Sequence, residues 1–211
     1  MAVMAVAILD YNAGNVTSVA HAVRRLGHEA EITFDPDTIR DADHVIFPGV
    51  GAAATCMKVV RERGLDVALR DAVESGKPVF CVCVGMQLLF DHSDEDGGVE
   101  CLGLLPGTVK RFELDDPTLK VPHMGWNPVT FADHEPLARE LVGASDTACY
   151  FVHSYYCDPD PSVQVIATTD HGPSFCVGVR KDNLVAMQFH PEKSGPVGMT
   201  ILKSFLDPKS L

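Results

Sequence analysis

The sequence predicts an α/β protein in three layers: an open, mostly parallel sheet, helices on both faces, and an antiparallel extension in the second half. Two observations predict this class. In the first half, short apolar runs alternate with segments whose apolar residues recur at helical spacing. In the second half, apolar segments follow one another closely, with only turn-like links between them.

The apolar runs of the first half predict strands buried in a parallel sheet. They lie at residues 3–9, 29–34 (a weaker run), 44–47 and 79–82. Between them, helical spacing predicts helices over residues 16–26, 52–61 and 66–74, and a further helix starts within 86–90. Gly27 follows the first helix and the Gly76-Lys77-Pro78 sequence breaks the third, as expected at helix ends. Strands that alternate with helices favour parallel pairing.

The second half has a different pattern. A turn and a strand are expected over residues 102–112, and close-set strands over 147–152, 163–168, 174–180 and 184–189. Residues 170–173 and 181–183 have turn-like composition, so these strands are predicted to pair antiparallel, at least in part. A closing helix is expected over 198–206.

Size and charge limit the possible functions. With 211 residues, 46% of them apolar, the chain can bury a core of its own, and we expect a single domain over residues 1–211, although this length also allows two small ones. The net charge of −12 repels phosphate backbones, so a nucleic-acid partner is not expected. The acidic surface favours solubility and could also meet a basic partner.

The cysteines indicate a reducing compartment. There are seven, an odd number, and none has zinc-finger or Cys-x-x-Cys spacing. They are predicted to be reduced core residues of a cytoplasmic protein without a metal site or cofactor. The apolar start, residues 1–9, is too short for a signal peptide, and no run approaches the roughly 20 residues that span a bilayer, so no membrane partner is expected.

Cys83 is the candidate nucleophile. A buried strand ends at this residue and a helix begins just after it, which places the thiol on a sharp strand-to-helix turn. The start of a helix carries partial positive charge and free N–H groups, which favour a thiolate and a bound oxyanion. Gly85 leaves room for the turn, whereas Cys81 stands where this pattern normally has Gly. Taken alone, a cysteine at a strand end is more often a core residue than a catalytic one.

His190 is the candidate base. It follows the apolar segment 185–189, at the sheet edge where open α/β sheets carry their active sites. A histidine can take the thiol proton and return it to the leaving amine. Glu192, two residues later, could accept the other ring N–H group and fix the tautomer.

The sequence Pro48-Gly49-Val50-Gly51 follows another buried strand. Its glycines permit backbone geometries closed to other residues, so the loop can aim N–H groups at a developing negative charge. An ordinary strand-to-helix turn would have the same composition. Phosphate binding is less favoured, because the Gly-Lys-Ser/Thr of a P-loop is absent.

Together these stretches resemble the class I glutamine amidotransferases, which use a Cys-His-Glu triad, over nearly the whole chain. Further segments are similar to the branch of this family that serves histidine biosynthesis: residues 10–15, 48–51, 121–127, 150–156 and 190–194. The most specific of them contains Met124-Gly125-Trp126-Asn127. The chain departs from the family at Asn12, at the three alanines 52–54 and at Cys81, and none of these is a triad position.

The resemblance implies a role for each matching residue. Cys83 would be the nucleophile, His190 the base and Glu192 its orienting group, with N–H groups of Val50 and Val84 as the oxyanion hole. The residues implied to bind the substrate glutamine are Gly49, Gly51, Gln87, Glu95, Ser154 and Tyr155. Those implied at the partner interface are Asn12, Asn15, Trp126, Tyr150 and Lys193.

In the family the partner is a (β/α)8-barrel cyclase, which forms a heterodimer with the glutaminase and receives its ammonia. Three alternatives remain open from the sequence: a glutaminase subunit for another pathway, a stand-alone γ-glutamyl hydrolase, and an inactive regulatory subunit. Low activity without the partner is also expected, with residues 49–51 as a switchable loop.

Overall fold

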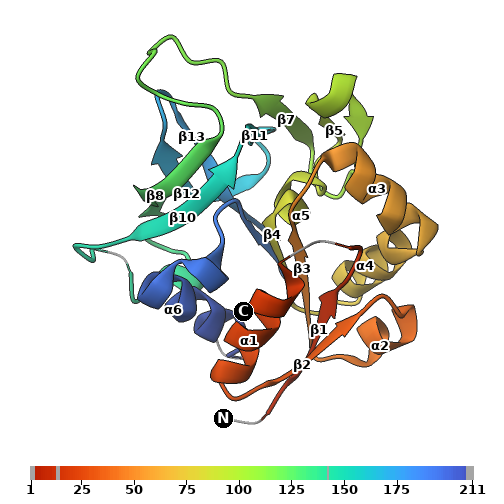
Figure 1. Ribbon diagram of the computed structural model, residues 1–211. Coiled ribbons are helices and arrows are strands. Elements are labelled where there is room, and N and C mark those ends of the chain that lie inside the picture. The colour runs from red at the N-terminus through yellow and green to blue at the C-terminus, as the bar shows by residue number, and fades with distance from the viewer. Residues whose placement is uncertain (1–2, 13–14, 142, 208–211) are drawn as a thin grey trace.

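Five parallel strands form the first part of the sheet in the computed structural model, which describes residues 3–12, 15–141 and 143–207 (Figure 1). Their order across the sheet is β2, β1, β3, β4 and β14. These strands comprise β1 (Ala5–Leu9), β2 (Glu29–Thr33), β3 (His44–Gly49), β4 (Val79–Cys83) and β14 (Leu184–Met187). Strands β3, β4 and β14 are buried along their whole length, as their apolar sequences predict.

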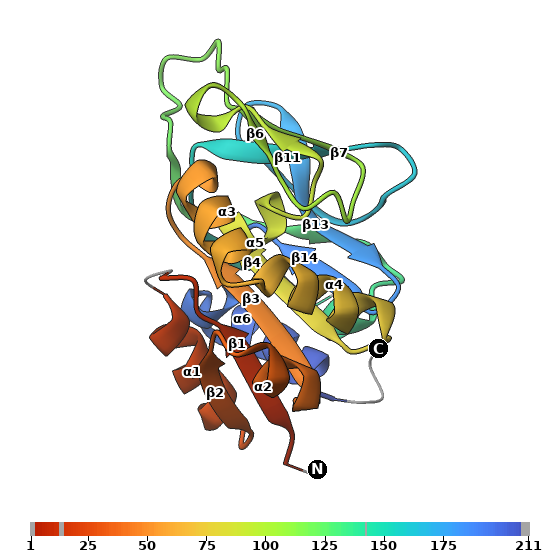
Figure 2. The same cartoon turned by 90° about the vertical axis from the view of Figure 1, so that its right-hand side faces the viewer.

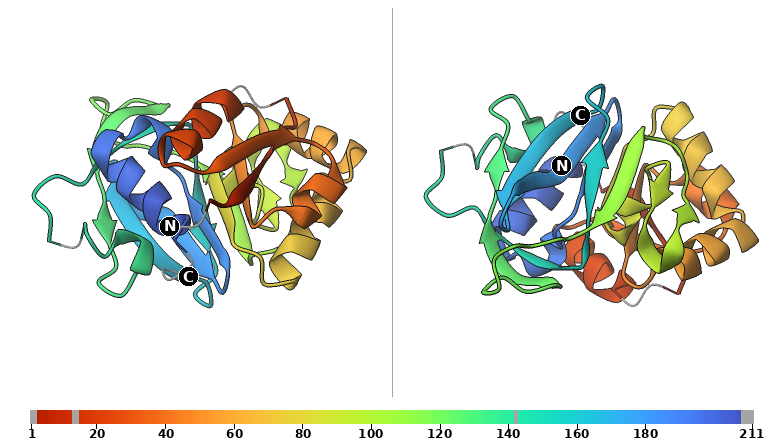
Figure 3. Two further views of the ribbon diagram at one scale, coloured as in Figure 1. Left: turned by 90° about the horizontal axis from the view of Figure 1, so that it is seen from below. Right: turned by 90° about the horizontal axis from the view of Figure 1, so that it is seen from above.

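Helices cover both faces of this parallel part. Figure 2 and the left view of Figure 3 show α1 and α6 on one face and α2, α3 and α4 on the other. Their bounds are α1 (Val16–Arg25), α2 (Pro36–Asp41), α3 (Ala53–Glu62), α4 (Leu65–Glu74) and α6 (Gly195–Phe205). Helix α1 buries Val19, Ala20 and Val23, the stripe expected from its spacing. The predicted three-layer α/β class is confirmed.

The sheet continues as a largely antiparallel extension. Strand β13 (Ser174–Lys181) pairs antiparallel with β14, and β11 (Tyr155–Pro159), β7 (Gly107–Arg111), β5 (His92–Ser93) and β6 (Val99–Glu100) follow in that order. Strand β12 (Gln164–Asp170) pairs with β13 and with β9 (Thr130–Phe131). Within the described residues the sheet therefore has twelve strands.

A separate two-stranded ribbon crosses this extension. It consists of β8 (His123–Pro128) and β10 (Ala148–His153), paired antiparallel with Trp126 opposite Tyr150. Burial alternates along both strands, so one face of the ribbon packs inward and the other is turned to solvent. Short 3₁₀ turns at Glu95–Gly97, Pro136–Ala138 and Pro191–Lys193 complete the fold.

The structure corrects several boundaries. A helix was expected to start within residues 86–90, but helix α5 spans Val84–Gln87 and ends there. It ends because the carbonyls of Leu88, Leu89 and Phe90 accept hydrogen bonds from residues 102–105. Strand β3 continues through Pro48 and Gly49, which pair with β4. Helix α6 begins at Gly195 rather than Gly198, with Pro196 in its first turn, where proline is well tolerated.

Helix α2 and the strands β5, β6, β8, β9 and β11 were not predicted. Helix α2 has a clear start signal, since the Asp35 side chain accepts from the Asp37 N–H group and Pro36 opens the helix. Strands β8 and β11 are short and rich in polar and aromatic residues, which hides their alternation. No helix in the described part of the chain is both long and apolar enough to cross a membrane.

Candidate active site

Cys83 lies at the end of β4, where the chain turns directly into α5. Its backbone has φ 55° and ψ −113°, a region that residues with a side chain rarely adopt. The turn is tight: a Cβ atom added to Gly85 would lie only 2.0 Å from the carbonyl oxygen of Phe47. Gly85 is thus required for the close approach of α5 to β3. Cys81, which replaces the usual glycine, is fully buried and fits within the sheet.

His190 and Glu192 meet beside this turn. Strand β14 pairs parallel with β4, so the residues that follow β14 emerge at the same sheet edge as Cys83. The Nδ1 atom of His190 lies 2.9 Å from Oε1 of Glu192, and both side chains are fully buried. The backbone N–H of His190 donates to the Tyr150 carbonyl at 3.0 Å, which fixes the position of the ring. The His190 ring also interacts with the Cys83 side chain, so the structure brings together the three residues predicted as a triad.

The electrostatics of His190 favour a protonated ring. Burial lowers the pKa of His190, whereas its interactions with Cys83 and Glu192 raise it, and the resulting pKa is about 10. A carboxylate can only accept, so Nδ1 donates to Glu192 and Nε2 is left for the thiol and the substrate. A positive ring beside the sulfur stabilises a thiolate.

Asn15 has a different place from the one implied by the resemblance. It was expected at the partner interface, but it is 5% exposed and lies against the triad. Its Nδ2 atom donates to Oε1 of Glu192 at 3.2 Å, the oxygen that also accepts from His190. Sequence reasoning missed this contact because Asn15 is far from Glu192 in the chain. Ala13 and Gly14, from the same motif, lie outside the described residues.

A cavity of about 360 Å³ opens above Cys83. Its walls come from the turn after β3, from the strand-to-helix turn at Cys83 and Val84 (the elbow), from the turn at Glu95, from Pro122, and from the end of β10 and the start of β11. The lining residues are Val50, Gly51, Cys83, Val84, Gln87, Glu95, Pro122, Val152, His153, Ser154 and Tyr155. Two larger hollows, of about 630 and 790 Å³, have no cysteine or histidine among the described residues that line them. The cavity at Cys83 therefore contains every residue proposed to bind glutamine except Gly49.

Glu95 reaches the cavity from its own turn and caps another element. Its Oε2 atom accepts from the Ala53 N–H group at 2.6 Å, at the start of α3. Ala52, the preceding residue, has no side chain that could make this bond. Burial raises the pKa of the Glu95 carboxyl group, while the bond to Ala53 opposes that change.

The candidate oxyanion loop lies next to the elbow. A Cβ atom on Gly49 would lie 1.9 Å from the Tyr11 hydroxyl, so no larger residue fits there. Gly51 has φ +117°, a conformation that favours glycine. Val50 lines the cavity together with Val84, which opens α5 and so has an N–H group without an acceptor inside that helix.

Gln188 is a site residue that sequence reasoning missed. Its Nε2 atom approaches the Cys83 sulfur at 3.7 Å, and its Oε1 atom accepts from Nε2 of Gln87 at 3.0 Å. The Gln87 amide also donates to the Tyr155 carbonyl at 3.0 Å. A fully buried Gln directly before Phe189 and His190 was the available signal, because a buried amide needs partners.

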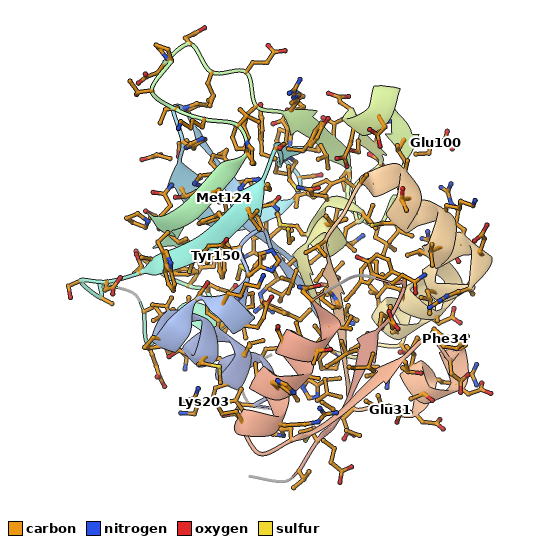
Figure 4. All side chains as sticks on the ribbon, viewed as in Figure 1. Glu31, Phe34, Glu100, Met124, Tyr150 and Lys203 are labelled. Atoms are coloured by element: carbon orange, nitrogen blue, oxygen red, sulfur yellow. The ribbon has the colours of Figure 1, made fainter. Side chains whose placement is uncertain are left out.

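Two of the remaining residues implied at the interface, Trp126 and Tyr150, lie on the outer face of the β8–β10 ribbon, and Lys193 lies beside Tyr150. Trp126 is 58% exposed and packs edge-on against Tyr150, with 6.2 Å between ring centroids. The Lys193 amine lies 5.8 Å from the centroid of the Tyr150 ring. Figure 4 shows Met124 and Tyr150 on the two strands of this ribbon. Asn12 is exposed on another segment and accepts from Arg63 at 3.3 Å.

The described residues contain no group of three or more His, Cys, Asp or Glu side chains that could hold a metal ion. Beside the cavity, Cys83, His190 and Glu192 offer a thiol, an imidazole and a carboxylate, with the Gln87 and Gln188 amides next to them. This set is suited to acyl transfer through a covalent thioester.

Comparison with known proteins agrees with this geometry. The family model "Glutamine amidotransferase class-I" matches residues 7–208. A protein of Acinetobacter baylyi, "Imidazole glycerol phosphate synthase subunit HisH", is 47% identical over 203 residues, covering 96% of this chain and 97% of that protein. The HisH subunit of Neisseria meningitidis serogroup B is 46% identical over 215 residues, covering 97% and 100%.

Solved structures share the fold. A crystal structure of a glutamine amidotransferase has a TM-score of 0.74 at 23% identity and covers 96% of this chain and 97% of its own. The structure of PurLQS from Thermotoga maritima has a TM-score of 0.71 at 18% identity, covering 95% and 96%. Sequence and fold agree over nearly the whole length, and the chain therefore belongs to the class I glutamine amidotransferase family, among the relatives of the HisH subunits.

Proposed function

We propose that this protein is the glutaminase subunit of imidazole glycerol phosphate synthase: it hydrolyses glutamine to glutamate and ammonia, which a cyclase subunit uses in histidine and AICAR biosynthesis. The observation that carries the proposal is the interaction of Cys83 with the bonded pair His190 and Glu192, with Cys83 lining a cavity that can hold a small amino acid. The identity to HisH subunits supports the choice of pathway.

In the first half of the reaction, the Cys83 thiolate attacks the δ-carbonyl carbon of glutamine. The carbonyl π bond opens, and the negative oxygen faces the N–H groups of Val50 and Val84. One such donor lowers the barrier by about 3 kcal/mol. His190 gives its Nε2 proton to the amide nitrogen, the C–N bond breaks, and ammonia leaves behind a γ-glutamyl thioester.

In the second half, His190 takes a proton from water, whose oxygen attacks the thioester carbonyl. The C–S bond breaks, glutamate leaves and the thiolate is restored. Glu192 keeps the proton on Nδ1 throughout, so Nε2 is always the atom that exchanges protons with the reacting groups. Gln87, Glu95, Ser154, Tyr155 and the glycines 49 and 51 are proposed to hold the substrate.

The proposed partner is a (β/α)8-barrel cyclase, bound as a heterodimer. The exposed aromatic and apolar residues on the ribbon support a partner at this face, since Met124 and Trp126 are 63% and 58% exposed. Interfaces are enriched in Trp, Tyr and Met. Lys193 lies beside Tyr150 and next to Glu192, so contact at this face is close to the triad.

A partner at this face also offers a reason for regulation. Ammonia made without a partner would be lost, so we propose low activity alone and stimulation by the liganded cyclase, with the loop of residues 49–51 as the gate. The shared hydrophobic core of the described residues supports one amidotransferase domain. All seven cysteines are described and unpaired, which supports a reducing compartment such as the cytoplasm.

The test is glutamate release from glutamine by the purified protein, alone, with the cyclase, and with the cyclase and its nucleotide ligand. Strong release only in the complete mixture, lost in Cys83→Ala, is expected. Trp126→Ala should weaken the stimulation and leave the elbow unchanged. Equal turnover with and without the cyclase would refute the gating, and full activity of Cys83→Ala would refute the nucleophile.

A further inference from the structure

A line of buried polar groups connects the ribbon to the glutamine cavity. We call Asn127, His123 and His153 the histidine chain. Nδ2 of Asn127 lies 3.3 Å from Nε2 of His123, and Nδ1 of His123 lies 3.0 Å from Nε2 of His153. Nδ1 of His153 lies 2.7 Å from the Tyr155 carbonyl oxygen. Both histidines are 5% exposed, so the bond between them is shielded from water, whereas Asn127 is half-buried.

The ring protons of the histidine chain can be assigned, starting from the bond to the Tyr155 carbonyl. A carbonyl oxygen only accepts, so Nδ1 of His153 carries a proton and donates to Tyr155. Burial lowers the pKa of His153 to about 3 and that of His123 to about 4, so both rings are neutral at pH 7. Nε2 of His153 therefore accepts from Nδ1 of His123, whose own Nε2 accepts from Asn127.

The Tyr155 end of the histidine chain leads to the nucleophile, Cys83. The Tyr155 carbonyl accepts a second bond from Nε2 of Gln87, at 3.0 Å. The other N–H of that amide donates to Oε1 of Gln188 at 3.0 Å, which leaves the Gln188 amide nitrogen facing the Cys83 sulfur at 3.7 Å. A reversed Gln188 amide would present its oxygen to a negatively charged thiolate.

We propose that His153 is a positioning residue of the glutamine site: by donating to the Tyr155 carbonyl it orients Gln87 and Gln188, so that an N–H group rather than an oxygen faces the Cys83 sulfur. His123 and Asn127 fix the tautomer of His153. The histidine chain starts on β8, where Trp126 is exposed, so it also connects the proposed partner face with the Cys83 sulfur. This last link rests on the proposed function, whereas the positioning role does not.

Two substitutions of His153 separate its two bonds. Asparagine places its amide nitrogen where Nδ1 lies, so His153→Asn keeps a donor for Tyr155 and loses the acceptor for His123. Glutamine places its amide where Nε2 lies, so His153→Gln keeps the acceptor for His123 and loses the donor for Tyr155. Both remove the ring and both leave one hydrogen bond; asparagine is the smaller by one methylene group, so a packing loss alone would harm His153→Asn more, the reverse of the order expected here.

The first measurement is the rate of Cys83 alkylation by iodoacetamide at pH 7.5, with the modified peptide identified by mass spectrometry. We expect His153→Asn to stay within about threefold of the parent and His153→Gln to slow by about tenfold, the effect of one lost hydrogen bond. Glutamate release with the liganded cyclase should follow the same order in kcat. His171→Asn is the control, because His171 stacks on His123 at 4.2 Å but makes none of the bonds of the chain.

Equal alkylation rates in the two His153 variants would overturn the proposal, whether both matched the parent or both fell, because the Tyr155 bond would then have no separate effect. Melting temperatures of both variants show whether they fold. If the parent protein released no glutamate with any partner, the proposed function would fail, while the alkylation comparison would still decide the role of His153.

Discussion

His190 and Glu192 are separated by a single residue, yet Nδ1 of His190 and Oε1 of Glu192 lie 2.9 Å apart. The 3₁₀ turn at Pro191–Lys193 makes this possible, because it folds the carboxylate back toward the ring as soon as β14 has ended. The base and the group that orients it are thus carried by one short segment. That segment is itself held by the bond from Ser194 Oγ to the His190 carbonyl at 2.7 Å.

Replacement of Glu192 by Gln should lower kcat by about a hundredfold or more with little change in KM. The amide keeps the shape of the side chain but removes the negative charge, and it can turn a donor toward Nδ1, which selects the wrong tautomer. Steady-state glutamate release with the liganded cyclase measures both constants. A kcat within threefold of the parent would show that Glu192 does not orient His190.

Asn15 should matter through Glu192 rather than through the partner. Loss of its bond in Asn15→Ala should lower kcat by about tenfold, because one hydrogen bond to a charged group is removed. Asn15→Asp should cost more, since it places a second carboxylate beside Glu192. The control is the affinity for the cyclase, measured by titration, which should not change in Asn15→Ala. A loss of affinity at unchanged kcat would return Asn15 to an interface role.

The backbone at Cys83 predicts an unusual order of stabilities. Glycine normally destabilises a protein relative to alanine, but at φ 55° and ψ −113° alanine keeps the strain and glycine relieves it. Cys83→Gly should therefore be more stable than Cys83→Ala by about 1 kcal/mol, and both should lack glutaminase activity. Urea unfolding of the two variants gives the difference. Greater stability of the alanine variant would mean that the elbow is not strained.

The buried histidines predict a loss of stability in mild acid. The folded-state pKa of His153 is about 3, below its ordinary value of 6.5, so the unfolded chain binds more protons between these limits and stability falls as pH falls. At pH 5 this costs about 2 kcal/mol. His153→Gln removes the group, so its free energy of unfolding should fall less between pH 7 and pH 5. Parallel losses in variant and parent would contradict the lowered pKa.

The sequence was sufficient to predict the parallel part of the fold and the meeting of the triad. Buried strands such as β1 and β4 have continuous apolar runs, and the ends of neighbouring parallel strands share one edge. Cys83 ends one such strand and His190 follows the neighbouring one, so the topology places them at the same sheet edge.

Contacts that depend on register and side-chain direction were beyond sequence reasoning. The bond from Asn15 to Glu192 joins two ends of the chain, and the Gln87 and Gln188 amides meet only because β4 and β14 are adjacent. The β8–β10 ribbon was missed as a pair because the inner positions of β8 hold His123, Gly125 and Asn127 rather than aliphatic residues. The resemblance to the family singled out residues 121–127, but only the pairing register of β8 with β10 shows which of their side chains face inward.

The burial of the six cysteines outside the active site determines which thiol of the protein peroxide can oxidise. Burial raises the pKa of the thiols of Cys56, Cys81, Cys101, Cys149, Cys157 and Cys176, so all of them remain protonated. Peroxide attacks thiolates, and Cys83 is the only cysteine that lines the described cavity. Oxidation would accordingly be confined to Cys83, where a sulfenic acid would inactivate the enzyme without unfolding it and would be reversed by a small reducing thiol.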